Sequence, residues 1–364
     1  MSTTEKARTT TDSTGTDNNE VVTHAITRLV EVPSAGAPGG SVRVALITLD
    51  NGRDHTRPNT VGPLGLASLD AAISTAIEAS PDAIAVTGKP FIFAAGADLS
   101  QLGSVADRGT AEEFVALGHR VFGRLREASV PTFAFVNGLA LGGGMELALH
   151  CDYRTLASNA AGMSQPEVFL GILPGWGGTQ LLPRIAGPEN AVTIIVENAL
   201  NQNRMMKPKD ALRLGAVDIV LDAADYLEQS LVWLVGVLDG SITVPRKDFG
   251  GATDDEWSAA LDRGKIIADL RTHGAAPAPY RALDQPSTSA QVLTRALEAL
   301  AQEARLILDE GVVADAADID LGMITGAGWP SWLGGITPFL DREGISERVN
   351  GRRFAPPGVA TLPA

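Results

Sequence analysis

Glu146 follows three consecutive glycines at residues 142–144, where an apolar strand over residues 133–136 gives way to the start of a helix. Glycine has no Cβ, so the backbone there can approach a ligand closely. The first N–H groups of a helix have no partner within the helix and lie at the positive end of its dipole. The pattern therefore predicts a place where developing negative charge is stabilised, one helical turn from a carboxylate.

Two other segments contain residue types suited to the same chemistry. Residues 164–167 read SQPE and place a second carboxylate, Glu167, on a short element that begins with proline. The glycine-rich motif GILPGWGGT follows at residues 171–179, after an apolar run. Residues 91–99 read FIFAAGADL and follow a short strand at 83–87, so we expect a small-residue loop with free backbone N–H groups there.

Each of these features also has a purely structural interpretation. The glycines alone suit a tight turn, Glu146 alone suits a solvated first helical turn, and Glu167 alone suits an early helix position after proline. Two carboxylates together can supply both general base and general acid chemistry, and the joint occurrence of the segments favours a site. His150 and Cys151 are neighbours on one helix and do not face each other, so we interpret both as core or supporting residues.

Together the segments resemble the crotonase (enoyl-CoA hydratase/isomerase) superfamily. The family pattern of AGAD, GGGxE, QPE and GxxPGxGGTQxLPR stands here in that order. The resemblance implies an α/β fold whose core, over roughly residues 22–240, is a spiral of ββα units. It also implies an acyl-CoA substrate, with coenzyme A as part of that substrate, no further cofactor and no metal. The spacing between the two glutamates is one residue longer than the family pattern, which we assign to a loop at 157–162.

The resemblance implies a role for individual residues. Glu146 would orient and deprotonate water, and Glu167 would deliver a proton to Cα of the substrate. The backbone N–H groups of Ala97 and Gly143 would form an oxyanion hole, each worth about 3 kcal/mol of transition-state stabilisation. The further substrate-binding residues would be Phe93, Ala95, Asp98, Leu99, Gly142, Gly175 and Trp176.

Several reactions remain open on such a site. Hydration of a 2-enoyl-CoA thioester uses both carboxylates, whereas Δ3-Δ2 enoyl-CoA isomerisation needs one, so the presence of both favours hydration in fatty-acid β-oxidation or a related pathway. A hydrolase, a decarboxylase or a non-catalytic acyl-CoA-binding partner of a separate dehydrogenase are the alternatives. Trp176 fits either a wall of the acyl pocket or a lid or core position. Lys89, Lys207 and Lys209 could meet phosphates of coenzyme A, although a solvated surface is favoured for each.

The periodicity of apolar residues predicts the elements around these segments. Residues 1–20 are polar and are expected to be disordered. A strand pair is expected at 21–32 and 42–49, followed by a helix at 64–79. A second helix is marked by apolar residues at helical spacing, namely Phe114, Leu117, Val121 and Leu125. This alternation predicts an α/β domain over residues 21–240.

Residues 241–364 are expected to form a linker and a mainly helical C-terminal extension, with an amphipathic helix at 291–308. Its last part resembles the C-terminal helical domain of 3-hydroxyacyl-CoA dehydrogenases, but no strand leads into a GxGxxG turn, so we expect no NAD binding. Residues 313–356 should be ordered, because several large apolar side chains would otherwise be exposed together, namely Trp329, Trp332, Leu333, Ile336 and Phe339.

Composition limits the classes of partner. A net charge of −14 and a pI near 4.8 argue against nucleic acid. The single cysteine excludes an intramolecular disulfide, and we see no signal peptide or membrane span, so we expect a cytoplasmic protein that does not enter membranes. The resemblance implies a homotrimer or hexamer and a possible association with a hydroxyacyl-CoA dehydrogenase.

Overall fold

A computed structural model describes residues 20–37, 39–98, 108–245, 252–283, 289–326 and 335–356. The chain divides into two compact units, of which the first ends at Gln285 and the second begins at Pro286. Most of the segment expected to be disordered lies outside the described residues. Its last residue, Glu20, is described, and its carboxylate accepts hydrogen bonds from the N–H groups of Leu64 (3.0 Å) and Gly65 (2.9 Å) at the start of a helix.

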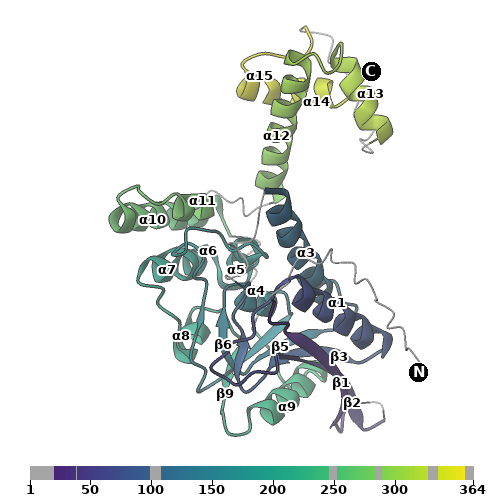
Figure 1. The fold of residues 1–364 in the computed structure, drawn as a ribbon, viewed down its shortest axis with the longest axis vertical. Helices are drawn as coiled ribbons and strands as arrows, with labels where there is room; N and C mark the ends of the chain where they lie inside the picture. The colour runs from purple at the N-terminus through teal and green to yellow at the C-terminus, as the bar shows by residue number, and fades with distance from the viewer. Residues whose placement is uncertain are drawn as a thin grey trace, which may run out of the picture. The chain divides into compact units, whose positions relative to one another are not determined.

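The first unit is built on a six-stranded sheet with the strand order β1-β2-β3-β5-β7-β9 (Figure 1). The first pair is antiparallel, as the hairpin-like sequence predicts, and every later pairing is parallel. Parallel pairing needs crossover connections, which confirms the α/β class. The strands are β1 (His24–Pro33), β2 (Ser41–Asp50), β3 (Ala83–Gly88), β5 (Thr132–Val136), β7 (Tyr153–Ala157) and β9 (Ile219–Leu221).

Both faces of this sheet are buried. Successive side chains of a strand point to opposite faces. On β3, Ile84 and Val86 therefore join the core beneath the helices that precede and follow this strand, while Ala83 and Ala85 join a second core. The second core is closed by α9 (Tyr226–Leu238), which contributes Trp233 and covers the other face of the sheet (Figure 1).

A smaller parallel sheet positions the candidate site. It has the order β4-β6-β8 and consists of β4 (Phe91–Ala94), β6 (Gly138–Leu141) and β8 (Met163–Ser164). Residues 91–94, which we had expected to belong to a loop, are thus a strand, because their apolar side chains pair with β6 and are mostly buried. All three motifs leave this sheet at the carboxyl ends of its strands. Since those ends lie at one edge, the sheet brings the motifs together.

Helices of the first unit begin close to where the sequence predicts them. The helix expected at 64–79 is α1, and the apolar residues between 114 and 125 lie in α3. The helix that carries Glu146 is short and fully buried. The helices are α1 (Pro63–Glu78), α3 (Arg108–Arg126), α4 (Gly143–Leu149), α5 (Gly178–Ala186), α6 (Pro188–Val192), the π-helix η1 (Thr193–Glu197), α7 (Asn198–Leu200) and α8 (Pro208–Arg213).

The first unit also extends past residue 240, where we had placed its end. Two further helices, α10 (Asp254–Thr272) and α11 (Ala278–Leu283), belong to it. Gly264 of α10 packs so closely that an added Cβ would lie 2.4 Å from Leu283 and 3.1 Å from Val192 of α6. This close packing places the unit boundary after α11.

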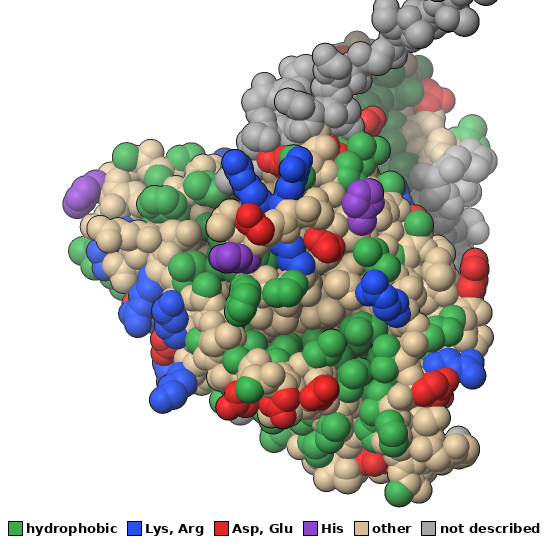
Figure 2. Space-filling view, turned by 60° about the horizontal axis from the view of Figure 1, so that its bottom comes forward, with side chains coloured by type: hydrophobic (Ala, Val, Ile, Leu, Met, Phe, Trp, Pro, Cys, Tyr) green, Lys and Arg blue, Asp and Glu red, His purple; other side chains and the backbone are tan. Residues whose placement is uncertain are grey.

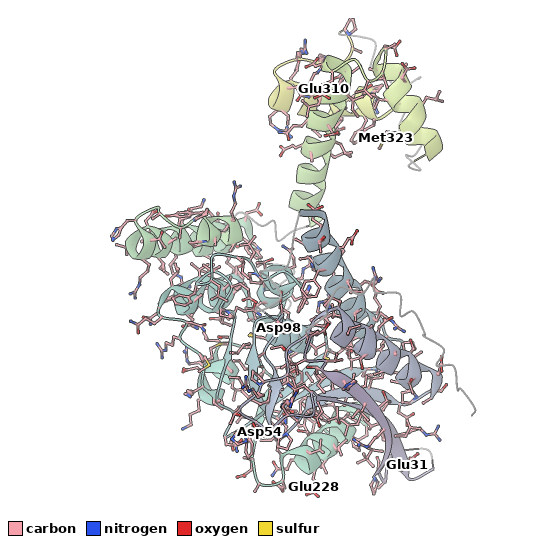
Figure 3. The ribbon with its side chains drawn as sticks, in the orientation of Figure 1. Glu31, Asp54, Asp98, Glu228, Glu310 and Met323 are labelled. Carbon is pink, nitrogen blue, oxygen red and sulfur yellow. The ribbon has the colours of Figure 1, made fainter. Side chains whose placement is uncertain are left out.

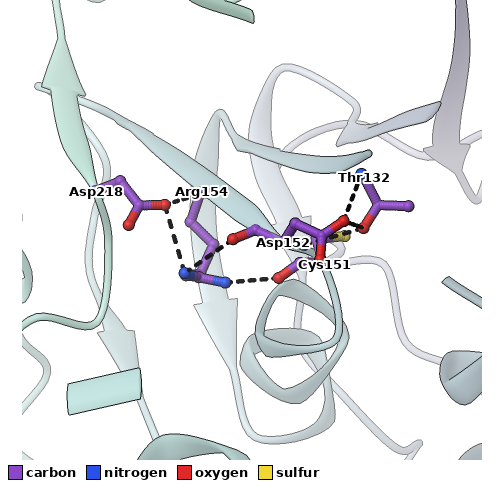
Figure 4. A network of polar contacts seen from close by, with 5 residues as sticks. All are labelled: Thr132, Cys151, Asp152, Arg154 and Asp218. Atoms are coloured by element: carbon purple, nitrogen blue, oxygen red, sulfur yellow. Dashed lines mark hydrogen bonds and ion pairs between the residues drawn. The ribbon is translucent and has the colours of Figure 1, made fainter. Parts of the chain in front are cut away.

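A buried polar network fixes the C-terminal end of α4 to the main sheet (Figure 4). The guanidinium of Arg154, which is 1% exposed, donates to the carbonyl of Cys151 at 2.7 Å and pairs with Asp218 at 3.4 Å. Asp152 accepts from both the N–H (2.8 Å) and the hydroxyl (2.9 Å) of Thr132. A paired buried charge is costly to break, so this network ties the segment just after α4 to the main sheet.

The second unit has its own small core. It contains α12 (Ser289–Asp309), α13 (Ala316–Gly326), α14 (Ile336–Arg342) and α15 (Ile345–Asn350), and α12 confirms the helix expected at 291–308. Buried Asp341 accepts from the N–H groups of Phe354 (3.0 Å) and Ala355 (2.9 Å). Glu310, just after α12, and Met323 of α13 belong to this unit (Figure 3).

The ordered tail that we expected at 313–356 is described in large part. Ile336 is buried and Phe339 packs against the same core. Trp329, Trp332 and Leu333 lie outside the described residues.

The surface mixes charges of both signs despite the negative total. Figure 2 shows hydrophobic side chains gathered among Lys, Arg, Asp and Glu side chains on one face. In the described part of the chain, no helix combines the length and the apolar character that crossing a bilayer would demand.

Candidate active site

A cavity of about 150 Å³ lies at the carboxyl ends of β4, β6 and β8. Most of the residues predicted from the sequence line it, although they come from four separate motifs. They are Ala95, Ala97, Gly142, Gly143, Glu146, Glu167, Gly175 and Trp176. Apolar side chains complete the wall, among them Phe114, Val115, Leu170, Ile172 and Leu173. A concave apolar site with two carboxylates is the expected setting for proton transfer to a mostly apolar ligand.

Glu146 is held by backbone donors. Its side chain is 1% exposed, and Oε1 accepts hydrogen bonds from the N–H groups of Trp176 (2.8 Å) and Gly178 (2.7 Å). Burial raises the pKa of Glu146 to about 7, while the two N–H donors lower it, because they stabilise the carboxylate. No hydrogen bond to Oε2 is found among the described residues, which leaves this oxygen for a ligand or water.

Glu167 lines the same cavity but lacks the pair of backbone donors from the loop at 174–178 that Glu146 has. It lies in a turn shortly after β8, on the short element that begins with Pro166, and it is 7% exposed. Its Oε2 is buried and has no hydrogen-bond partner within the described residues. Burial and the nearby negative charge of Glu146 raise the pKa of Glu167 to about 8. The two backbone donors therefore stabilise the ionised form of Glu146, and the negative charge of Glu146 favours the protonated form of Glu167.

Ala97 and Gly143, whose N–H groups are the predicted oxyanion hole, line the same cavity. Val61 donates to the carbonyl of Gly96 (2.8 Å) and accepts from the N–H of Asp98 (3.4 Å), so the N–H of Ala97 points away from Val61. The loop of Gly96 rests on the start of α4, since an added Cβ there would lie 2.7 Å from the nitrogen of Gly143. The two amides thus lie on adjacent backbone at one end of the cavity.

Trp176 both lines the cavity and belongs to the core. Its side chain is 4% exposed and makes edge contacts with Phe114 and Phe122 of α3, with ring centroids 5.3 and 5.2 Å away. Two glycines make room for the indole: an added Cβ would lie 2.1 Å from it at Gly118 and 2.3 Å from it at Gly143. The sequence left open whether Trp176 is a wall of the pocket or a core aromatic, and its ring is both.

Three predicted substrate-binding residues are not found in this cavity. Phe93 of β4 is fully buried in the core and does not line this cavity, so its role in substrate binding stays a prediction. Asp98 lies in a separate surface depression with Asp54, Arg53 and Arg57. Figure 3 labels Asp98 and Asp54. Leu99 lies outside the described residues.

Two of the three lysines that we considered as phosphate contacts have internal partners, whereas Lys209 is exposed on α8. Lys89 is 4% exposed, and its ammonium donates to the side chain of Asn51 and to the carbonyls of Arg53 (2.9 Å) and Arg57 (2.6 Å). Lys207 donates to the carbonyl of Ala161 at 2.8 Å. Lys89 therefore orders the loop at 51–57 instead of facing a ligand. The described residues hold no cluster of His, Cys, Asp and Glu suited to a metal.

Two polar residues beside the site were not assigned a role from the sequence. His150 was interpreted as a core or supporting residue, and its Nε2 lies 2.9 Å from the carbonyl oxygen of Trp176. Gln165 is 1% exposed, and its amide has no partner among the described residues. An added Cβ on Gly178 would lie 3.1 Å from both Gln165 Oε1 and Glu146 Oε1, which places Gln165 near the first carboxylate. The spacing of four residues between Glu146 and His150 was the available signal, because such residues share a helix face.

Comparison with known proteins agrees with the motifs. The sequence profile of the enoyl-CoA hydratase/isomerase family matches residues 40–247. The chain is 38% identical over 237 residues to a probable enoyl-CoA hydratase, echA8, of Mycobacterium bovis, which covers 64% of this chain and 86% of that protein. It is 35% identical over 207 residues to the fatty acid oxidation complex subunit alpha of Idiomarina loihiensis, and it spans only 28% of that protein's length.

A similar solved structure is the enoyl-CoA hydratase from Bacillus anthracis. It has 24% sequence identity and a TM-score of 0.47, and the match covers 70% of this chain and 88% of that one.

Proposed function

Because the chain belongs to the enoyl-CoA hydratase/isomerase family, we propose that it adds water to 2-enoyl-CoA thioesters to give 3-hydroxyacyl-CoA. The observation that carries this proposal is the pair of buried carboxylates on one cavity. Glu146 has two N–H donors on one oxygen, whereas Glu167 Oε2 has no partner among the described residues. Hydration requires one base and one acid on the same substrate, and these two environments favour that division.

The proposed reaction begins at the thioester carbonyl, whose oxygen accepts from the N–H groups of Ala97 and Gly143. Glu146 removes a proton from water, and the water oxygen forms a bond to Cβ. The electron pair of the Cα–Cβ double bond moves toward the carbonyl, where the two amides stabilise the resulting enolate. Glu167 then donates its proton to Cα. Proton transfer from protonated Glu146 to ionised Glu167 through water resets the site for the next turnover.

Isomerisation of 3-enoyl-CoA to 2-enoyl-CoA is the second candidate on this site. It requires removal of a proton from Cα and its return at the γ-carbon, which one carboxylate can accomplish. The presence of two carboxylates with different hydrogen-bond environments supports hydration as the main reaction. A non-catalytic acyl-CoA-binding partner of a dehydrogenase is a weaker alternative, since such a role gives no reason to bury two carboxylates together.

The setting of the reaction follows from the relatives. The similarity to a fatty acid oxidation complex subunit supports a place in fatty-acid oxidation or a related acyl-CoA pathway. We propose a cytoplasmic location. We also propose a homotrimer or hexamer and an association with a hydroxyacyl-CoA dehydrogenase. A light-scattering mass equal to the 37.9 kDa monomer at micromolar concentration would contradict the oligomer.

The direct test is an absorbance assay of the conjugated enoyl thioester, with crotonyl-CoA and longer 2-enoyl-CoA homologues as substrates. Hydration removes the absorbance of the conjugated bond. A parallel assay with 3-enoyl-CoA would instead gain that absorbance if the chain is an isomerase. Loss of the signal with 2-enoyl substrates supports the proposal. Gain with 3-enoyl substrates and no loss with 2-enoyl substrates would replace it by isomerisation.

A further inference from the structure

The backbone that holds Glu146 is itself held by a histidine. We call residues 174–178, which connect the turn after Glu167 to α5, the clamp loop. Its N–H groups at Trp176 and Gly178 donate to Glu146 Oε1, at 2.8 and 2.7 Å. The carbonyl of Trp176 points the other way, toward His150 Nε2 at 2.9 Å. The clamp loop therefore lies between two side chains of one helical stretch, four residues apart.

The chemistry of this contact defines the state of His150. A carbonyl oxygen can only accept, so Nε2 carries the proton and donates it. Nδ1 is buried and has no partner among the described residues, which suits an unprotonated nitrogen. Burial lowers the pKa of His150 to about 4, so the imidazole is neutral at physiological pH. His150 thus supplies one hydrogen bond and no charge.

Packing around the clamp loop leaves little freedom for a different backbone path. Gly177 has a φ of +111°, and an added Cβ there would lie 3.2 Å from His150 Nε2. An added Cβ on Gly178 would lie 3.1 Å from Glu146 Oε1. The loop is therefore in close contact with both side chains, and a shift of its backbone would change its distance to each.

An apolar side chain would fill the position of His150 without the cost of a buried polar ring. His150 is 7% exposed and packs edge-on against Phe122, with ring centroids 5.9 Å apart. Burying an imidazole with one nitrogen unpartnered is unfavourable compared with burying a hydrocarbon of the same size. An apolar residue at position 150 could make the packing contacts but not the hydrogen bond to the carbonyl of Trp176, so this bond accounts for a histidine here.

We propose that His150 is a positioning residue for Glu146: its N–H fixes the clamp loop so that two backbone amides stay on the carboxylate. This inference rests on the proposed function for its kinetic consequences, but not for its structural ones. Loss of the donor at His150 leaves the carbonyl of Trp176 unpaired, loosens residues 174–178 and weakens both hydrogen bonds to Glu146 Oε1. The carboxylate then loses stabilisation and accepts a proton at higher pH.

Other charged groups near His150 are few among the described residues. His119 and Arg126, both on α3, act on its ionisation. The ring of His119 also hydrogen-bonds the backbone of Gly175 in the clamp loop, and burial lowers its pKa. Glu146 and Glu167 line the same cavity, and the charge of Glu146 acts on Glu167. Replacement of His150 should therefore act through the loop, not through a change in nearby charge.

The test compares His150→Met, which keeps volume and removes the donor, with His150→Gln, which keeps an N–H donor at similar reach. Leu149→Met is the control for altered packing of the same helix, because Leu149 is 1% exposed and contributes no atom to the cavity lining. Amide hydrogen exchange of the clamp loop is measured in the full chain for all four proteins. We expect exchange at Trp176 and Gly178 to be about 10-fold faster in His150→Met, and near wild-type rates in His150→Gln and Leu149→Met.

Kinetics with crotonyl-CoA give the second readout. His150→Met should lower kcat about 10-fold with little change in KM, and the acidic limb of kcat/KM against pH should move to higher pH. His150→Gln should keep both the kcat and the acidic limb of kcat/KM close to those of the wild type. Unchanged exchange in His150→Met, or an equal loss in His150→Gln and His150→Met, would overturn the inference. If the wild-type chain hydrates no enoyl-CoA, the proposed function fails, and the exchange rates still decide whether His150 positions the loop.

Discussion

The environments of Glu146 and Glu167 differ although both carboxylates line one cavity and both are almost fully buried. Glu146 comes from a helix and is met by two backbone N–H groups of the clamp loop. Glu167 comes from a turn, and its Oε2 meets no donor within the described residues. Burial raises both pKa values, the two clamp-loop donors stabilise the ionised form of Glu146, and the charge of Glu146 further raises the pKa of Glu167. The proposed division into a base and an acid rests on this difference between the two environments.

Removal of either carboxylate should have the largest effect. Glu146→Gln and Glu167→Gln keep shape but abolish proton transfer, so each should lower kcat for crotonyl-CoA by at least about 10²-fold. Circular dichroism should show an unchanged fold. An isomerase would need only one of the two, so retention of activity with one variant would argue against paired catalysis in hydration.

A smaller loss of kcat is expected when a methyl group is added next to the carboxylate of Glu167. Gly142 has a φ of +50°, and an added Cβ would lie 2.7 Å from Glu167 Oε1. Gly142→Ala should therefore displace this carboxylate and lower kcat by roughly 10-fold or more, with backbone strain of about 1–3 kcal/mol.

Gly123→Ala, on α3 and outside the cavity lining, is the matched control. An added Cβ there would have its nearest contact at 4.0 Å, from Glu127 Oε1, which is ordinary van der Waals distance. We expect kcat within about three-fold of wild type, because neither glutamate is displaced. Equal losses in the two alanine variants would show that crowding of Glu167 is not the cause.

The pH dependence should reflect both environments. Activity requires ionised Glu146, so kcat/KM should fall as pH drops through its pKa of about 7. It also requires protonated Glu167, so kcat/KM should fall as pH rises through its pKa of about 8. The predicted result is a narrow bell between these limbs. A rate that keeps rising well above the upper limb would contradict the role of Glu167 as acid.

The smallest effect is expected when nicotinamide cofactors are offered to the second unit. Its sequence resembles part of a dehydrogenase but offers no glycine-rich turn for a pyrophosphate. Calorimetric titration with NAD and NADH should give no heat of binding, and 3-hydroxyacyl-CoA should not be oxidised. Micromolar binding of NAD would show that this unit contributes chemistry of its own.

Much of the site was predictable because its signals are local. Glycines before Glu146 and proline before Glu167 mark turns at strand ends, and the motif order reveals the family to which residues 40–247 belong. The periodicity of apolar residues also located α1, α3 and α12. These features depend on residues close together in the chain.

What the sequence left open depends on contacts between distant residues. β4 is four residues long, so its apolar run did not distinguish a strand from a loop. The burial of Phe93 and Lys89, and the packing of α10 on the first unit, become visible only when the sheets are assembled. Likewise, the partner of His150 lies 26 residues further along the chain.

The most direct test of the account is the protonation state of each glutamate in the folded protein. Infrared difference spectra of chains labelled with ¹³C-glutamate, wild type minus each Gln variant, can be recorded at about pH 7.5, between the pKa values of about 7 and 8. The account predicts that Glu146→Gln removes mainly a carboxylate band and that Glu167→Gln removes mainly a protonated carboxyl band. The reverse assignment would contradict the division into base and acid.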